Sequence, residues 1–145
     1  MRRLAVRAGV IWIAALAAAC AGFEMAPQDP PSPRPECNDA SVTIYFPEES
    51  ATLQPLADPL LTQLMQRVNA CQGAGGELRE IRIVAYPDSG ANRSMREAEM
   101  RMRGARVRAA LVAAGAPEDK IRVVRPRGDL RQVMQRRAEV TADLF

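Results

Sequence analysis

One acidic residue and two arginines are spaced so that they can face a single site. Asp88 ends an alternating stretch that predicts a strand, and Arg96 and Arg103 lie in the arginine-rich segment that follows. At about 100° per residue, a helix there would place both arginines on one flank. The chemistry open to such a set is recognition of charge. The same side chains can instead pair with one another, and Glu99 has helical spacing to both arginines.

The residue inventory argues against an enzyme. The chain has no His, no convincing nucleophile and base pair, and no cluster of residues spaced to hold a metal ion. Asp88 alone in a turn would be a poor general base at the usual pKa of an aspartate. We therefore expect no catalysis, no metal and no cofactor.

The charge balance gives no reason to expect nucleic acid. The chain has 20 Lys and Arg against 17 Asp and Glu. The excess comes from Arg2, Arg3 and Arg7, in an amino-terminal segment that holds no acid, so the remainder is neutral. No aromatic residues interleave with the arginines, as single-strand binding would favour.

A strand and a helix are expected to carry the candidate site. Apolar residues alternate at Ile81, Ile83 and Ala85, which predicts a strand that Pro87 and Gly90 end. From about Asn92 the period becomes helical, with a core stripe of Met100, Gly104, Val107, Leu111 and Ala114, closed by Gly115 and Pro117.

Further elements complete a mixed pattern of strands and helices. A first strand alternates at Val42, Ile44 and Phe46, and a helix begins at Pro55 or at Asp58-Pro59. The buried face of that helix is indicated by Leu60 or Leu61, Leu64, Val68 and Cys71. A third strand is indicated by Ile121 and Val123, and whether it includes Arg125 is left open. The last strand covers 138–145, with Ala138, Val140, Ala142 and Leu144 facing inward.

Four segments together resemble the OmpA-like peptidoglycan-binding domain, which also occurs in peptidoglycan-associated lipoproteins. The first is VTIYFPEESATLQP, and the second is AYPD together with its spacing to Arg103, Val107 and Leu111. The third and fourth are APEDKI and QRRAEV. The resemblance implies an α+β two-layer sandwich over residues 37–145. Its order is β-α-β-α-β-β, with a mixed sheet and both helices on one face.

The resemblance also implies a ligand. In that family the aspartate and the arginine at the positions of Asp88 and Arg103 hold the diaminopimelate side chain of the peptidoglycan stem peptide. A carboxylate suits its ammonium, and a guanidinium suits its carboxylate. The chain departs from the family at Pro87, Arg96, Glu99-Met100 and Met102, which stand where Thr, Asn, Leu-Ser and the first Arg are usual.

Three more residues are candidates for ligand contact, each with an alternative. Arg96 either binds a second carboxylate or repels the ammonium. Tyr86 either stacks on a sugar or lies buried in the sheet. Arg137, beside Arg136 at the last strand, either lines the groove or stabilises a turn.

The amino-terminal segment resembles a lipoprotein signal. Residues 1–19 join arginines to a short apolar run, and small residues precede Cys20, which would carry the lipid. An ordinary secretory signal and an uncleaved anchor are the alternatives. Ala21 follows Cys20, and a residue other than Asp at this position resembles the lipoproteins that are sorted to the outer membrane. Residues 20–36 are then expected to form a proline-rich tether, whose extended part reaches on the order of 50 Å. Disorder without such a role is the alternative.

Two cysteines of the domain are expected to pair. The first helix runs back along the first strand, so its end lies near that strand's start, where Cys71 and Cys37 stand. An oxidising envelope compartment favours a disulfide. Two free buried thiols and a catalytic redox pair are the alternatives, although no C-x-x-C spacing is present.

These observations predict an outer-membrane lipoprotein with its domain in the periplasm. The domain would bind peptidoglycan without a covalent bond and tether the outer membrane to the wall. The alternative is a degenerate domain that has lost wall binding and serves as a docking or structural subunit among envelope proteins. A thiol-redox protein is the third reading.

Overall fold

The computed structural model describes residues 34–88, 92–127 and 136–145. The predicted signal segment 1–19, the expected lipid attachment at Cys20 and the tether up to residue 33 lie outside the described residues. The described elements follow the order η1 (Pro35–Cys37), β1 (Ala40–Tyr45), α1 (Ala57–Gly73), β2 (Leu78–Ala85), α2 (Arg93–Ala113), η2 (Glu118–Lys120), β3 (Ile121–Val124) and β4 (Arg137–Leu144).

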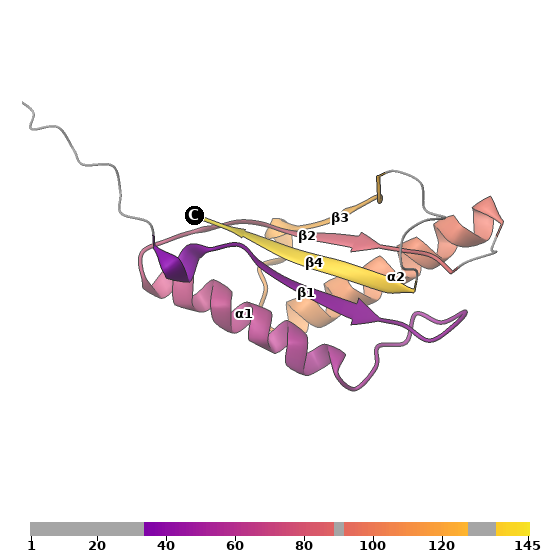
Figure 1. Ribbon diagram of the computed structural model, residues 1–145, viewed down its shortest axis with the longest axis horizontal. Coiled ribbons are helices and arrows are strands. Elements are labelled where there is room, and N and C mark those ends of the chain that lie inside the picture. The colour runs from indigo at the N-terminus through magenta and orange to yellow at the C-terminus, as the bar shows by residue number, and fades with distance from the viewer. Residues whose placement is uncertain (1–33, 89–91, 128–135) are drawn as a thin grey trace, which may run out of the picture. The chain divides into compact units, whose positions relative to one another are not determined.

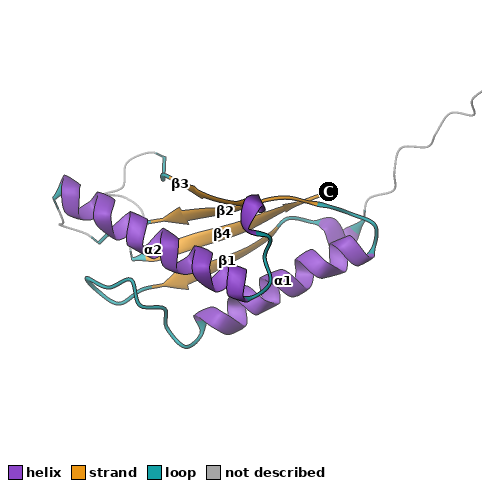
Figure 2. Cartoon of the chain, turned by 180° about the vertical axis from the view of Figure 1, so that it is seen from behind, coloured by secondary structure: helices purple, strands orange, loops and turns teal. Residues whose placement is uncertain are grey.

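The four strands form one mixed sheet in the order β1-β4-β2-β3. β4 is antiparallel to both of its neighbours, whereas β2 and β3 are parallel and are linked through α2. Figures 1 and 2 show both helices on the same face of the sheet. The predicted α+β two-layer sandwich and its β-α-β-α-β-β order are therefore confirmed.

The strands bury one face because their apolar residues alternate. Ala138, Val140 and Ala142 of β4 are all fully buried, and the register pairs them with inward-facing residues of β1 and β2. The odd-numbered residues of β4 point to the opposite side, which is called here the open face of the sheet. Ile121 begins β3 as predicted, but β3 ends at Val124, before Arg125.

The first helix lies within the predicted limits. It begins at Ala57, between the two proposed starts, and buries Leu61, Leu64, Met65, Val68 and Cys71. Gly75 has a φ of +80° just beyond its end, a conformation that glycine adopts without strain.

The second helix begins as predicted, but its buried stripe is rotated from the predicted one. The side chain of Asn92 caps it by accepting a hydrogen bond from the backbone N–H of Met95 at 2.9 Å. Gly104, Val107 and Leu111 are buried as expected, but the first half buries Glu99 and Arg103, and Met100 is only half-buried. Arg103 therefore lies on the buried stripe itself, where the sequence placed it on a flank.

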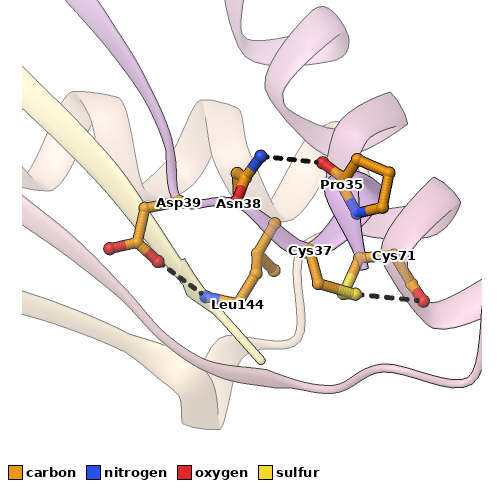
Figure 3. The surroundings of a disulfide bond; sticks show 6 residues. All are labelled: Pro35, Cys37, Asn38, Asp39, Cys71 and Leu144. Atoms are coloured by element: carbon orange, nitrogen blue, oxygen red, sulfur yellow. Dashed lines mark hydrogen bonds between the residues drawn. A yellow bond between two sulfur atoms is a disulfide. The ribbon is translucent and has the colours of Figure 1, made fainter. Parts of the chain in front are cut away.

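The predicted disulfide is present. Cys37 and Cys71 are joined with an S–S distance of 2.13 Å, and Figure 3 shows the bond between the turn before β1 and the end of α1. Nearby, Asp39 Oδ1 accepts a hydrogen bond from the Leu144 N–H at 3.1 Å, so the same end of the domain also ties β1 to β4.

Candidate functional site

Asp88 and Arg103 meet at the end of the domain where β2 finishes. Strand β2 delivers Asp88 three residues after Ala85, and the helical repeat of α2 turns Arg103 toward the sheet. Asp88 Oδ1 and Arg103 Nη2 lie 2.5 Å apart. The two residues that the sequence singled out are thus in direct contact.

Arg103 is bound on every side by the protein. Its Nε donates to the Ser50 carbonyl at 2.9 Å, Nη1 donates to the Tyr86 carbonyl at 2.8 Å, and Nη2 is 3.5 Å from the Pro47 carbonyl. The guanidinium carbon lies 5.3 Å from the centre of the Phe46 ring. The residue is 0% exposed, and these contacts satisfy most of its donors. A single side chain therefore joins α2 to the end of β2 and to the loop after β1.

Asp88 is almost as enclosed. Its Oδ2 accepts a hydrogen bond from the Glu49 N–H at 2.5 Å, and its own N–H donates to Glu99 Oε2 at 2.9 Å. Glu49 has a φ of +51°, a conformation that an L residue adopts only when its surroundings hold it there. Asp88 is 6% exposed. The carboxylate thus fixes the loop after β1 as well as Arg103.

The charges of this cluster are therefore paired within the protein. A buried ion pair is tolerated when the remaining donors and acceptors are also satisfied, as they are around Arg103. Among the alternatives raised by the sequence, the pairing of Asp88 with Arg103 is the arrangement in the structure. Arg103 has no exposed surface, so a ligand can reach it only if the chain around it moves.

Glu99, which the sequence indicated only as a possible ion-pair partner of the arginines, is a member of the site. It is 9% exposed, and its Oε2 accepts the hydrogen bond from the Asp88 N–H. The cluster therefore contains a second buried carboxylate. Its spacing of four residues to Arg103, continued by Val107 and Leu111, was the available signal. That signal is weak because glutamate usually marks a solvated helix face.

Arg96 lies on the same side of α2 as Arg103, two turns nearer the amino-terminal end of the helix. It is half-buried. The two arginines thus share one side of the helix as predicted, but Arg103 lies on the buried stripe and not on a flank of it.

Tyr86 and Arg137 form a separate cluster on the open face of the sheet. The Tyr86 hydroxyl donates to Glu139 Oε2 at 3.0 Å, and Arg137 holds Glu139 Oε1 through Nε at 2.9 Å and Nη2 at 2.7 Å. The Arg137 guanidinium carbon lies 4.0 Å from the centre of the Tyr86 ring. The ring face that a sugar would need is therefore in contact with arginine, and Tyr86 is half-buried.

Electrostatics and burial act together on Tyr86. Burial raises the pKa of its hydroxyl, and the hydrogen bond and negative charge of Glu139 raise that pKa further, while Arg137 opposes them. Arg137 is 8% exposed, and its Nη1 is buried with no hydrogen-bond partner among the described residues. The five predicted ligand residues are thus divided: Asp88, Arg103 and Arg96 lie on the helix side, Tyr86 and Arg137 on the open face.

Among the described residues, no group of three or more His, Cys, Asp or Glu residues is arranged to hold a metal ion. In the same ranges, no helix combines the length and the apolar character needed to cross a membrane.

The fold is shared with solved structures, although no protein-family model and no curated protein sequence matches the chain. The peptidoglycan-associated lipoprotein from Burkholderia pseudomallei has a TM-score of 0.54 at 20% identity, covering 69% of this chain and 88% of that one. The OmpA-like domain of FopA1 from Francisella tularensis subsp. tularensis SCHU S4 has a TM-score of 0.57 at 14% identity, covering 76% of this chain and 75% of that one. The fold is therefore that of an OmpA-like domain, as the sequence motifs predicted.

Proposed function

We propose that the chain is an envelope lipoprotein whose OmpA-like domain binds the diaminopimelate of peptidoglycan stem peptides and tethers the outer membrane to the wall. The observation that carries this proposal is the pairing of Asp88 with Arg103 at the end of β2. An anion and a cation at that position match the charges of diaminopimelate. The similarity to the fold of a peptidoglycan-associated lipoprotein supports an envelope location.

Binding proceeds by exchange of partners. The ligand ammonium replaces the Arg103 guanidinium at Asp88, and the ligand carboxylate replaces Asp88 at Arg103. Each buried charge then keeps a partner, which avoids the large cost of an unpaired buried charge. The loop after β1 has to open for this exchange, because the Pro47 and Ser50 carbonyls hold Arg103 in the closed state.

Attachment to the outer membrane is assigned to Cys20. Processing after Ala19 would leave a lipid-modified Cys20 as the new amino terminus, and more than one acyl chain gives stable anchoring. The tether to residue 36 then spans the distance to the wall. In cells supplied with a labelled fatty acid, the chain is expected to incorporate the label and the Cys20→Ala variant is not. Absence of label from the unchanged chain, or equal labelling of the variant, would contradict the lipid anchor at Cys20.

A pull-down with purified sacculi tests wall binding. The full chain should be retained, and so should Arg106→Ala, which removes an exposed arginine of α2 away from the site. The Asp88→Asn, Arg103→Gln double variant should be released, provided that its circular dichroism shows a folded domain. Retention of this folded variant at the level of the unchanged chain would remove the proposed mechanism.

One observation favours a second function. Arg103 is fully buried, so its contacts also suit a purely structural role in a domain that docks an envelope protein. In that case the folded double variant would still co-purify with the same protein partner, and neither it nor the unchanged chain would be retained by sacculi.

A further inference from the structure

A groove lies on the other flank of α2, between that helix and β3. It has a cavity volume of about 400 Å³. Its apolar floor includes Met100 and Val123, its rim includes Arg101 and Arg125, and Val124 also lines it. Asp88, Glu99 and Arg103 do not line it. The groove is therefore separate from the site of the proposed wall binding.

The floor of the groove ends at a free sheet edge. β3 is the last strand in the sheet order and pairs only with β2, so its outer backbone has no strand partner among the described residues. Val123 is 44% exposed and Val124 is 36% exposed, although both belong to a strand. An edge strand with exposed β-branched residues is a template for pairing with another extended segment.

The position of α2 fixes the inner wall of this groove. A Cβ atom placed at Gly104 would come within 2.7 Å of Val123 Cγ1, so glycine permits the close approach of the helix to β3. The wall is thus formed by packing in the domain itself. A preformed groove needs little ordering when a segment binds.

The rim of the groove is positively charged. Arg101 and Arg125 are exposed, and neither makes an ion pair with a described residue. Arg108 also lines the groove, at 3.2 Å from Glu118. Glu97, the acidic residue of the lining, is paired with Arg93 at 3.4 Å. Ion pairs as exposed as these contribute little to stability, so a competing charged partner can replace either member readily.

We propose that this groove docks an extended segment of a partner protein that carries acidic side chains beside apolar ones. The segment adds as a strand to the free edge of β3, its apolar side chains contact Met100 and Val123, and its carboxylates reach Arg101 and Arg125. A second copy of this chain fits less well, because pairing two β3 edges would bring the same arginines of both copies together. The surface is independent of the proposed wall binding.

The test uses residues 21–145, which contain every described element, and a capped pentapeptide, Glu-Val-Thr-Val-Glu. Its binding is followed by NMR shifts of the backbone amides. The control peptides replace both Glu by Gln, or carry N-methyl groups on alternate residues. Shifts should concentrate at Ile121–Val124 and along the Met100 flank of α2, and both control peptides should bind about tenfold more weakly.

Variants of the protein complete the test. The Arg101→Ala, Arg125→Ala pair should weaken binding of the acidic peptide about tenfold, whereas Arg67→Ala, Arg106→Ala should leave it unchanged. Each of three results would overturn the proposal: no binding at millimolar peptide, equal binding of the control peptides, or concentration-dependent self-association through β3. Loss of retention by sacculi does not bear on this outcome, since the two surfaces are separate.

Discussion

Arg103 combines a full charge with complete burial, and this makes it the most sensitive residue of the cluster. Its side chain is held by Asp88 and by the backbone carbonyls of Pro47, Ser50 and Tyr86. Removing one partner of a buried ion pair costs far more than the net value of the pair, because the remaining charge stays buried. The residue therefore acts on stability whether or not a ligand binds.

Replacement of Arg103 by alanine should lower the free energy of unfolding by about 3–5 kcal/mol. The change leaves Asp88 without its cation and three carbonyls without their donor. Urea unfolding measures the effect, with the exposed Arg106→Ala as the control, for which a change within about 0.5 kcal/mol is expected. An Arg103→Ala domain as stable as the unchanged one would show that the ion pair does not form.

Tyr86 gives the domain a pH dependence in the alkaline range. Its folded-state pKa is raised above the unfolded value of about 10 by burial and by Glu139. The folded state therefore holds the proton more tightly, and stability falls as pH rises from about 10 through the folded-state pKa. In a Tyr45→Phe background, ultraviolet titration should give a Tyr86 pKa above that of free tyrosine. Adding Glu139→Gln should lower the measured value, and no change would refute the role of Glu139.

At the scale of the elements, the disulfide holds the end of the domain opposite the charge cluster. It joins the turn before β1 to the end of α1. Gly76 packs directly against it, since a Cβ atom there would overlap the sulfur atoms of both Cys37 and Cys71. The structure thus supports a packing role for the cysteines.

Removing the disulfide should destabilise the domain without altering ligand binding. The Cys37→Ala, Cys71→Ala variant should lose about 3–4 kcal/mol in the free energy of unfolding, by the loop-entropy relation for a separation of 34 residues. Alanine is preferred to serine because Cys71 is fully buried. Urea unfolding and retention by sacculi are the two measurements. Unchanged retention would dispose of the thiol-redox reading, whereas loss of retention in a folded variant would contradict this prediction.

The elements also show where sequence periodicity stops being informative. The stripe of α2 was predicted from its apolar residues, and Val107 and Leu111 confirmed its second half. The first half is buried through Glu99 and Arg103, because two charges that satisfy each other can occupy an interior position. Hydrophobic patterning cannot identify such a pair, since each residue alone indicates a solvated face.

At the scale of the whole molecule, the fold was predictable and the grouping of the site was only partly so. Strand alternation and turn residues gave the element order, and the family motifs gave the sheet. Tyr86 follows the inward-facing Ala85, and Arg137 precedes the inward-facing Ala138, so alternation along each strand turns both side chains to the open face. The register of β4 against β2 then makes them neighbours. No local pattern contains that register, so the sequence could not show that these two residues form a cluster apart from Asp88.

The most direct test of wall binding compares two stem tripeptides by NMR titration of residues 21–145. One carries diaminopimelate at its third position, and the other carries lysine, which has the ammonium but lacks the distal carboxylate. Exchange of partners at Asp88 and Arg103 predicts amide shifts around Asp88 and the first turns of α2. It also predicts about 10- to 100-fold weaker binding of the lysine peptide. Equal affinity for both peptides, or no shifts at millimolar diaminopimelate peptide in a folded domain, would contradict the proposed function.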